Sequence, residues 1–132
     1  MRLGATLYVK NSFEAVERYK EAFGLTLGYH VIHDEEEIGQ HYFHASLMRG
    51  EEEIFAVSEF GNYLEDRYLA EIPISRHNTE ICLGLGSEEA VKKAFSVLSE
   101  GGMVITPLES TSWNACVAQV VDKYGIGWFI CI

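Results

Sequence analysis

The sequence predicts an α+β protein built from two βαβββ modules. A strand, a helix and three strands are predicted twice along the chain in the same order. The two copies also share a residue pattern, since Ser12, Glu14, Ala15 and Val16 are echoed at the same spacing from Ser87 onward. With 132 residues, 48% of them hydrophobic and 23% charged, the composition is that of a globular protein. We therefore expect residues 1–60 and 78–132 to be the modules of one compact domain, joined by a linker at 61–77.

The first module begins with a short apolar strand at Leu3–Val9. Asn11 or Ser12 is then suited to cap a helix, and Glu14 follows Asn11 at the spacing of a capping box. Apolar residues recur at helical spacing from Phe13 to Phe23, and Gly24 ends the helix. Three strands follow, with breaks at glycines and acidic turns: Thr26–His33, Gln40–Arg49 and Glu53–Phe60.

The second module repeats this order after the linker, in which a short helix is predicted at 63–69. A strand at Thr79–Leu85 precedes Ser87, which is suited to cap a helix rich in acidic residues in its first turn. The pair Gly101-Gly102 ends this helix. The remaining strands are predicted at Met103–Leu108, Ala115–Val121 and Gly127–Ile132.

Charge and composition exclude several classes of partner. The net charge is −10, so the chain offers no basic surface for nucleic acid or for an anionic membrane. No apolar run approaches the roughly 20 residues that span a bilayer, and the N-terminus lacks the apolar stretch of a signal peptide. The three cysteines are an odd number without metal-ligand spacing, which fits reduced thiols. We expect a cytoplasmic protein.

Two acidic runs, 34–37 and 51–53, fall where turns between strands are predicted. A cation site is one interpretation. Neither run has the alternating ligand spacing and central glycine of a calcium loop. We therefore interpret these carboxylates as solvated turn residues.

Four histidines lie on the two strands predicted to follow the first helix. Within each strand the two histidines are three apart and face opposite sides, so neither pair chelates a metal by itself. If the strands form a hairpin, His30 or His33 lies beside His41 or His44. We interpret them as surface or pocket-lining residues, with His41 and His44 as candidate bases.

Other residues have both a functional and a structural interpretation. Cys82 shares its predicted face with Glu80, but no Cys-His motif accompanies it, so a small buried apolar role is favoured over a nucleophile. Trp113 precedes the seventh strand and would either gate a pocket or anchor the loop. Trp128 is expected to pack under the helices or at an interface.

Three stretches carry a resemblance to a known superfamily. They are Tyr8–Asn11 with Ala15–Gly24, then Gly101–Val104 with Pro107-Leu108 and Trp113, and finally Val121–Trp128. In these stretches and in element order the chain resembles the vicinal oxygen chelate superfamily (glyoxalase/bleomycin-resistance/dioxygenase), and within it the PhnB-like branch. The resemblance implies that each module curls into a half-open barrel sheet, that a ligand lies on the concave face, and that the protein is a homodimer.

In metal-dependent members, four side chains on the concave strands hold a divalent metal, and the resemblance assigns each a position here. The first falls at Gly4 or a neighbour, none of them a credible ligand. The second falls at Phe55, with Glu59 on the same face. The third is Glu80 and the fourth Phe129. Three protein ligands are normal for a catalytic metal, so we expect no standard metal site and no cofactor. The phenylalanines instead suggest an apolar pocket floor.

Three hypotheses of function follow. The first is a PhnB-like protein that binds a small, partly apolar molecule, with or without metal-independent catalysis. The second is a metal-dependent lyase or dioxygenase, in which His41 or His44 reaches Glu59 and Glu80. The third is an interaction module without a small ligand. The candidate catalytic residues are Glu80, His44 and His41, and the candidate ligand-binding residues are Phe55, Glu59, Cys82, Trp113 and Phe129.

Overall fold

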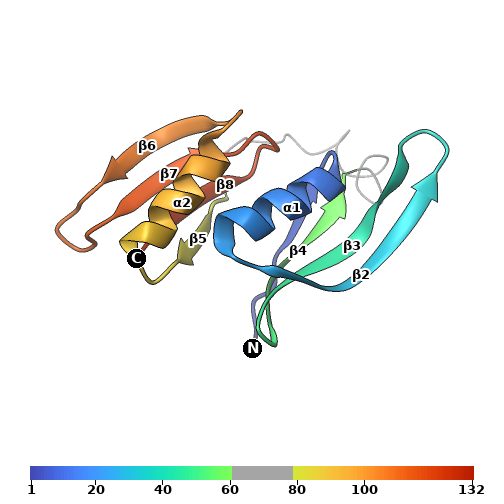
Figure 1. Ribbon diagram of the computed structural model, residues 1–132, viewed down its shortest axis with the longest axis horizontal. Coiled ribbons are helices and arrows are strands. Elements are labelled where there is room, and N and C mark those ends of the chain that lie inside the picture. Colours follow the sequence, from blue (N-terminus) through green and yellow to red (C-terminus); the bar gives the residue numbers. More distant parts are fainter. Residues whose placement is uncertain (61–78) are drawn as a thin grey trace. The chain divides into compact units, whose positions relative to one another are not determined.

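A computed structural model describes residues 1–60 and 79–132, which form two successive units, each with one helix and a four-stranded sheet (Figure 1). The expected α+β architecture of two βαβββ modules is confirmed. The predicted linker 61–77 and its short helix lie outside the described residues. The two units are treated separately below.

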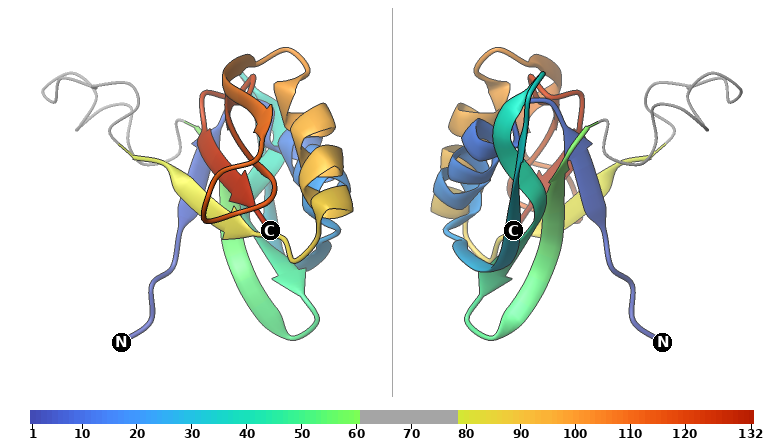
Figure 2. Two further views of the ribbon diagram at one scale, coloured as in Figure 1. Left: turned by 90° about the vertical axis from the view of Figure 1, so that its left-hand side faces the viewer. Right: turned by 90° about the vertical axis from the view of Figure 1, so that its right-hand side faces the viewer.

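The first unit contains β1 (Thr6–Val9), α1 (Ser12–Phe23), β2 (Thr26–Glu35), β3 (Gly39–Arg49) and β4 (Glu52–Glu59). The strand order is β1-β4-β3-β2. The β2-β3-β4 meander is antiparallel, and β1 returns through α1 to pair in parallel with β4. Figure 2 shows residues 1–5 as an extended tail before β1.

The core of the first unit lies between α1 and one face of this sheet. Val16 and Tyr19 are fully buried on α1, as the helical spacing predicts. The Tyr19 ring packs edge-on against Phe55 of β4, with ring centroids 5.7 Å apart. Phe55 and Val57 therefore face α1, and their neighbour Ala56 faces the opposite side of the sheet. We call this opposite side the open face of the first sheet.

The start of α1 differs from the prediction. Asn11 is the N-cap residue in a left-handed conformation (φ 64°), and its side chain makes no capping hydrogen bond. The Glu59 carboxylate caps the helix instead, because it accepts hydrogen bonds from the backbone N–H groups of Asn11 (2.8 Å) and Ser12 (2.7 Å). Asparagine tolerates this left-handed conformation better than most residues. The predicted capping box is therefore not formed, although the helix lies where it was expected.

The second unit repeats the topology with β5 (Ile81–Gly84), α2 (Glu88–Ser99), β6 (Met103–Glu109), β7 (Val117–Val121) and β8 (Gly127–Cys131). The strand order is β5-β8-β7-β6, with β5 parallel to β8. The predicted cap of α2 is confirmed, since the Ser87 side chain accepts a hydrogen bond from the Ala90 N–H. Figure 2 shows α2 along one face of this sheet.

Trp128 is the largest fully buried side chain of the second unit. Its indole N–H donates to Asp122 (2.8 Å), and the other Asp122 oxygen accepts from the backbone N–H groups of Tyr124 and Ile126. The Asp122 carboxylate is itself buried, so these bonds compensate for its removal from water. This confirms the packing role predicted for Trp128.

Strand β6 lies at the edge of the second sheet. Met103, Val104 and Ile105 are all exposed on it. Pro107 falls within the second of two register shifts in its pairing with β7. Proline is tolerated on edge strands because one N–H can be lost there.

No helix in the described part of the chain is long and apolar enough to cross a membrane.

Candidate functional site

A row of four side chains crosses the second sheet on the face that α2 does not cover. Cys82 on β5 is the direct partner of Phe129 on β8, Phe129 pairs with Gln119 on β7, and Gln119 pairs with Thr106 on β6. Direct cross-strand partners point to the same face of a sheet. Trp128 and Ile130, which alternate with Phe129, are completely buried. The row therefore defines the open face of the second sheet.

Glu80 joins this row through Gln119. The Gln119 amide nitrogen donates to both carboxylate oxygens of Glu80, at 3.0 and 3.3 Å, although β8 lies between the two strands. Gly127 lies beside Glu80 and adds no side chain to the face at this point. The other end of the amide accepts a hydrogen bond from the Thr106 hydroxyl at 2.8 Å. The result is a fixed polar chain across the open face.

Trp113 adds a large aromatic surface to this face. Its indole stacks on the Phe129 ring, with centroids 5.9 Å apart and an interplanar angle of 23°, yet the residue remains 65% exposed. An exposed tryptophan with one covered side can accept a second flat group on the other side. The structure thus brings together four of the predicted site residues, Glu80, Cys82, Trp113 and Phe129.

Cys82 is exposed rather than buried, which corrects the expectation of a small core residue. Desolvation raises the pKa of its thiol, and Cys131 and the Glu80 carboxylate raise it further. A thiol with a raised pKa has little thiolate at neutral pH. Cys82 is therefore a lining residue here and not an activated nucleophile.

Phe55 and Glu59 lie elsewhere than predicted. Phe55 is 1% exposed and packs on Tyr19, and Glu59 caps α1, so both face the helix and not the open face of the first sheet. Ala56 and Ser58 occupy the open-face positions on β4. A shift of one residue moves a side chain to the other face, which accounts for the error.

His44 belongs to a second polar chain, on the first sheet. Its Nε2 lies 3.1 Å from the Ser46 hydroxyl, and that hydroxyl donates a short hydrogen bond to the Glu53 carboxylate. Because a carboxylate only accepts, the serine proton points to Glu53, and His44 must donate to the serine oxygen. A catalytic triad needs the histidine in the middle, as the base for the serine. The His44–Ser46–Glu53 hydrogen bonds therefore do not activate Ser46 as a nucleophile.

His41 lies at a cavity of about 650 Å³ in the first unit. The cavity lies beside the N-terminus of α1 and the β2–β3 turn. Ser12 links the start of α1 to β3, because its hydroxyl accepts a hydrogen bond from the Tyr42 N–H at 2.9 Å. Residues from four elements and their connections line the cavity: Lys10, Asn11, Ser12, Phe13, Glu35, Glu37, Ile38, Gln40, His41, Glu59 and Phe60.

The predicted meeting of histidines across a hairpin is confirmed. His33 on β2 is the direct partner of His41 on β3. Glu35 was expected in a solvated turn, but it belongs to β2, and its carboxylate lies 3.6 Å from Nε2 of His41. Glu53, from the second acidic run, was also expected to be a solvated turn residue, but its carboxylate accepts a hydrogen bond from the Ser46 hydroxyl.

Several members of these networks were not predicted: Ser46, Glu53, Thr106 and Gln119. Each depends on cross-strand register, and an isolated sequence carries no signal for that register.

The four positions that the resemblance assigns to a metal do not fit one. Glu80 offers a carboxylate, while Phe129 offers no donor and Phe55 is buried against α1. Glu59, the alternative donor on β4, already accepts two backbone hydrogen bonds. One carboxylate is far from the three or four ligands that a transition metal requires.

Comparison with known proteins supports the fold alone. Neither a family model nor a curated protein sequence matches the chain. Among solved structures, a PhnB protein from Bacillus cereus is 19% identical with a TM-score of 0.74, covering 99% of this chain and 98% of that one. Protein PA1353 from Pseudomonas aeruginosa is 25% identical with a TM-score of 0.74, covering 99% and 96%.

A third similar structure is a mutant of FosX, a fosfomycin resistance protein of the vicinal oxygen chelate superfamily from Listeria monocytogenes. It is 13% identical with a TM-score of 0.64, covering 99% of this chain and 90% of that one. That protein was solved with Mn(II) and a dihydroxypropylphosphonic acid. The sequence resemblance and these structures agree that the chain has the glyoxalase/bleomycin-resistance fold of the vicinal oxygen chelate superfamily, as PhnB-like proteins do.

Proposed function

We propose that this protein binds a small, partly apolar molecule on the open face of the second sheet. The observation that carries the proposal is Trp113, which is held against Phe129 and leaves most of its surface exposed. The stack on Phe129 fixes the orientation of the indole, so its uncovered face is already placed to receive a second flat group. A flat or apolar ligand group stacked on the indole would do so.

The polar chain beside the stack sets the chemistry of the ligand. The Glu80 carboxylate can only accept hydrogen bonds, so it favours a ligand with a hydroxyl or amine group. The Gln119 amide already holds Glu80 in place, which lowers the entropy lost on binding. If the protein is also a catalyst, Glu80 is the residue we propose as its general base.

A thermal-shift screen of aromatic and antibiotic-like molecules tests this proposal. A binder that stabilises the protein would then be titrated while tryptophan fluorescence is recorded. Trp128 is buried, so a change in emission reports on Trp113. We expect Trp113→Ala to weaken binding by at least about tenfold, the equivalent of about 1.4 kcal/mol.

Tyr29→Ala is the matched control, because it removes an equally prominent exposed aromatic from the first sheet. It should leave the affinity unchanged. The proposal is wrong if no molecule of the screen stabilises the protein, or if both variants bind a hit as tightly as the wild type.

We also propose that the protein is a homodimer, as the resemblance implies. Light scattering on a sizing column measures this directly, and a mass near 14.9 kDa would contradict it.

A further inference from the structure

We infer that the β2–β3 hairpin carries a site for a divalent transition-metal ion, formed by His33, Glu35 and His41. This site is separate from the four strand positions that the resemblance assigned to a metal, and from the face of the second sheet proposed to bind a small molecule. One ligand atom from each of the three side chains lies within 4.8 Å of the others.

The hairpin itself brings the three side chains together. His33 and Glu35 are two residues apart on β2, so they point to the same face. His41 is the direct partner of His33 on β3. The His33 ring also stacks on Phe43, with centroids 4.3 Å apart and an angle of 25°, which restricts its orientation. Two of the three ligands are therefore held by packing or pairing before any ion binds.

His41 has the features of a prepared metal ligand. It is 3% exposed, and its Nδ1 lies 2.9 Å from the backbone oxygen of Gly39. A carbonyl oxygen only accepts, so Nδ1 must carry a proton, and in the neutral tautomer this leaves the lone pair on Nε2. Ligating histidines commonly use this second hydrogen bond to fix their tautomer.

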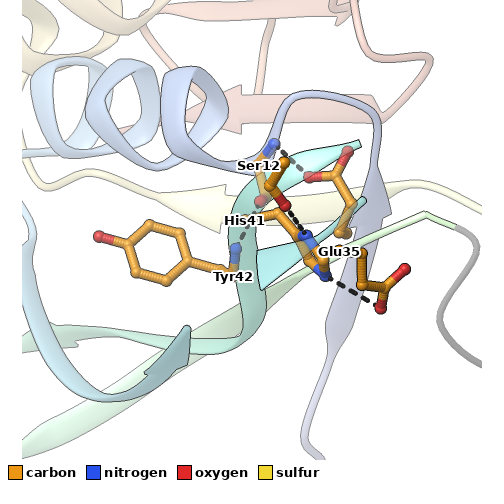
Figure 3. A network of polar contacts seen from close by, with 6 residues as sticks. Ser12, Glu35, His41 and Tyr42 are labelled. Carbon is orange, nitrogen blue, oxygen red and sulfur yellow. Dashed lines mark hydrogen bonds and ion pairs between the residues drawn. The ribbon is translucent and has the colours of Figure 1, made fainter. Parts of the chain in front are cut away.

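The Nε2 atom of His41 is also unsatisfied. It is buried and makes no hydrogen bond with any described residue, although the Glu35 carboxylate lies 3.6 Å away (Figure 3). A buried polar atom without a partner is costly. An ion coordinated by Nε2 and by the Glu35 carboxylate would satisfy both groups at once.

The surroundings favour a cation. Glu37 and Glu59 also line the cavity, while Lys10 is the one lysine or arginine among its lining residues. The Glu59 carboxylate already serves the start of α1. Glu37 thus adds negative charge to the cavity that Glu35 and His41 line.

The donor set selects the class of metal. Two imidazoles and one carboxylate suit Zn²⁺ and its neighbours in the first transition row, whereas Ca²⁺ and Mg²⁺ prefer oxygen ligands throughout. Ligand atoms around a tetrahedral Zn²⁺ are about 3.4 Å apart at normal bond lengths. No pair of ligand atoms must therefore close by more than about 1.4 Å, and His41 and Glu35, already 3.6 Å apart, need only a small change. The Glu35 side chain is 51% exposed and can move toward His33. Three protein ligands leave a fourth position for water or a small anion.

Zinc titration of tag-free, chelator-treated protein tests the inference. We expect calorimetry to give one Zn²⁺ per chain, and Co²⁺ in its place to give the visible absorption of a tetrahedral site. Both His33→Ala and Glu35→Gln change exposed residues, so the protein should stay folded. Each should weaken zinc binding by at least about 100-fold, since even partners of the ligands contribute 10–100-fold.

The controls are His30→Ala on the same strand and Glu36→Gln next to the site, both exposed. They should bind zinc as the wild type does. The inference is wrong if His33→Ala and Glu35→Gln retain full affinity, or if all four variants weaken binding equally, as diffuse surface binding would.

A fifth variant, Glu80→Ala, separates this inference from the proposed function. Zinc lost only in Glu80→Ala would place the metal at a position of the superfamily and overturn this inference. Zinc retained there, and lost in His33→Ala, would support it whether or not any small molecule binds near Trp113.

Discussion

Removal of the Glu59 carboxylate should destabilise the first unit more than any other single carboxylate change on β4. The carboxylate accepts two backbone hydrogen bonds at the start of α1, where the helix dipole also favours a negative charge. A hydrogen bond to a charged group contributes about 1.5–3 kcal/mol. Asn11 is exposed, so water can replace one bond, but Ser12 is completely buried and its N–H would lose its partner.

We therefore expect Glu59→Ala to lower the free energy of unfolding by about 2–4 kcal/mol. For a chain of this size that corresponds to a fall in Tm of roughly 8–16 °C. Glu59→Gln keeps one acceptor oxygen and should cost about half as much. Thermal and urea unfolding followed by circular dichroism measure both values.

Glu52→Ala is the control, because it removes an exposed carboxylate at the other end of the same strand. It should change the free energy of unfolding by less than about 0.5 kcal/mol. If Glu59→Ala lies within that same range, the carboxylate does not cap α1 and the reasoning is refuted.

Three further outcomes are expected. Asp122→Ala should cost about 3–5 kcal/mol in urea unfolding, because it leaves the buried indole N–H of Trp128 unpaired; an unchanged midpoint would contradict the role of that bond. Gly102→Ala should destabilise the protein by at least about 2 kcal/mol, since a Cβ would collide with two backbone oxygens, and a neutral effect would show that the chain relaxes there. Alkylation of Cys82, followed by mass spectrometry, should have its pH midpoint above that of an ordinary thiol because the Cys82 pKa is raised. Glu80→Gln removes a negative charge that opposes the thiolate, so it should lower this midpoint, and a rise would be inconsistent with the assignment.

The elements could be predicted because their signals are local. The apolar spacing of α1 and the Ser87 cap of α2 lie within a few residues of the structures they specify. The shared face of Glu80 and Cys82 was also accessible, since it needs only strand alternation, and the family resemblance placed Phe129 with them.

The rest depends on contacts between distant parts of the chain. The Glu59 carboxylate accepts a hydrogen bond from Ser12, 47 residues away, and the sequence around neither residue predicts this contact. The face of Phe55 could not be fixed because Phe55 and Ala56 are both apolar, and either would satisfy a core. Similarly, Gln119 meets Glu80 across β8 from 39 residues away, a contact that depends on how the strands are paired.

The edge strand β6 bears on the behaviour of the protein at high concentration. An exposed apolar edge is a template on which the strand of another molecule can add, and repeated addition leads to fibres. The exposed apolar residues Met103, Val104 and Ile105 would favour such strand addition. Pro107 contributes no N–H, and the two register shifts break the regular alternation that a straight incoming strand would need. The proline that interrupts the sheet thus hinders the addition of further strands at this one edge, where apolar side chains remain exposed.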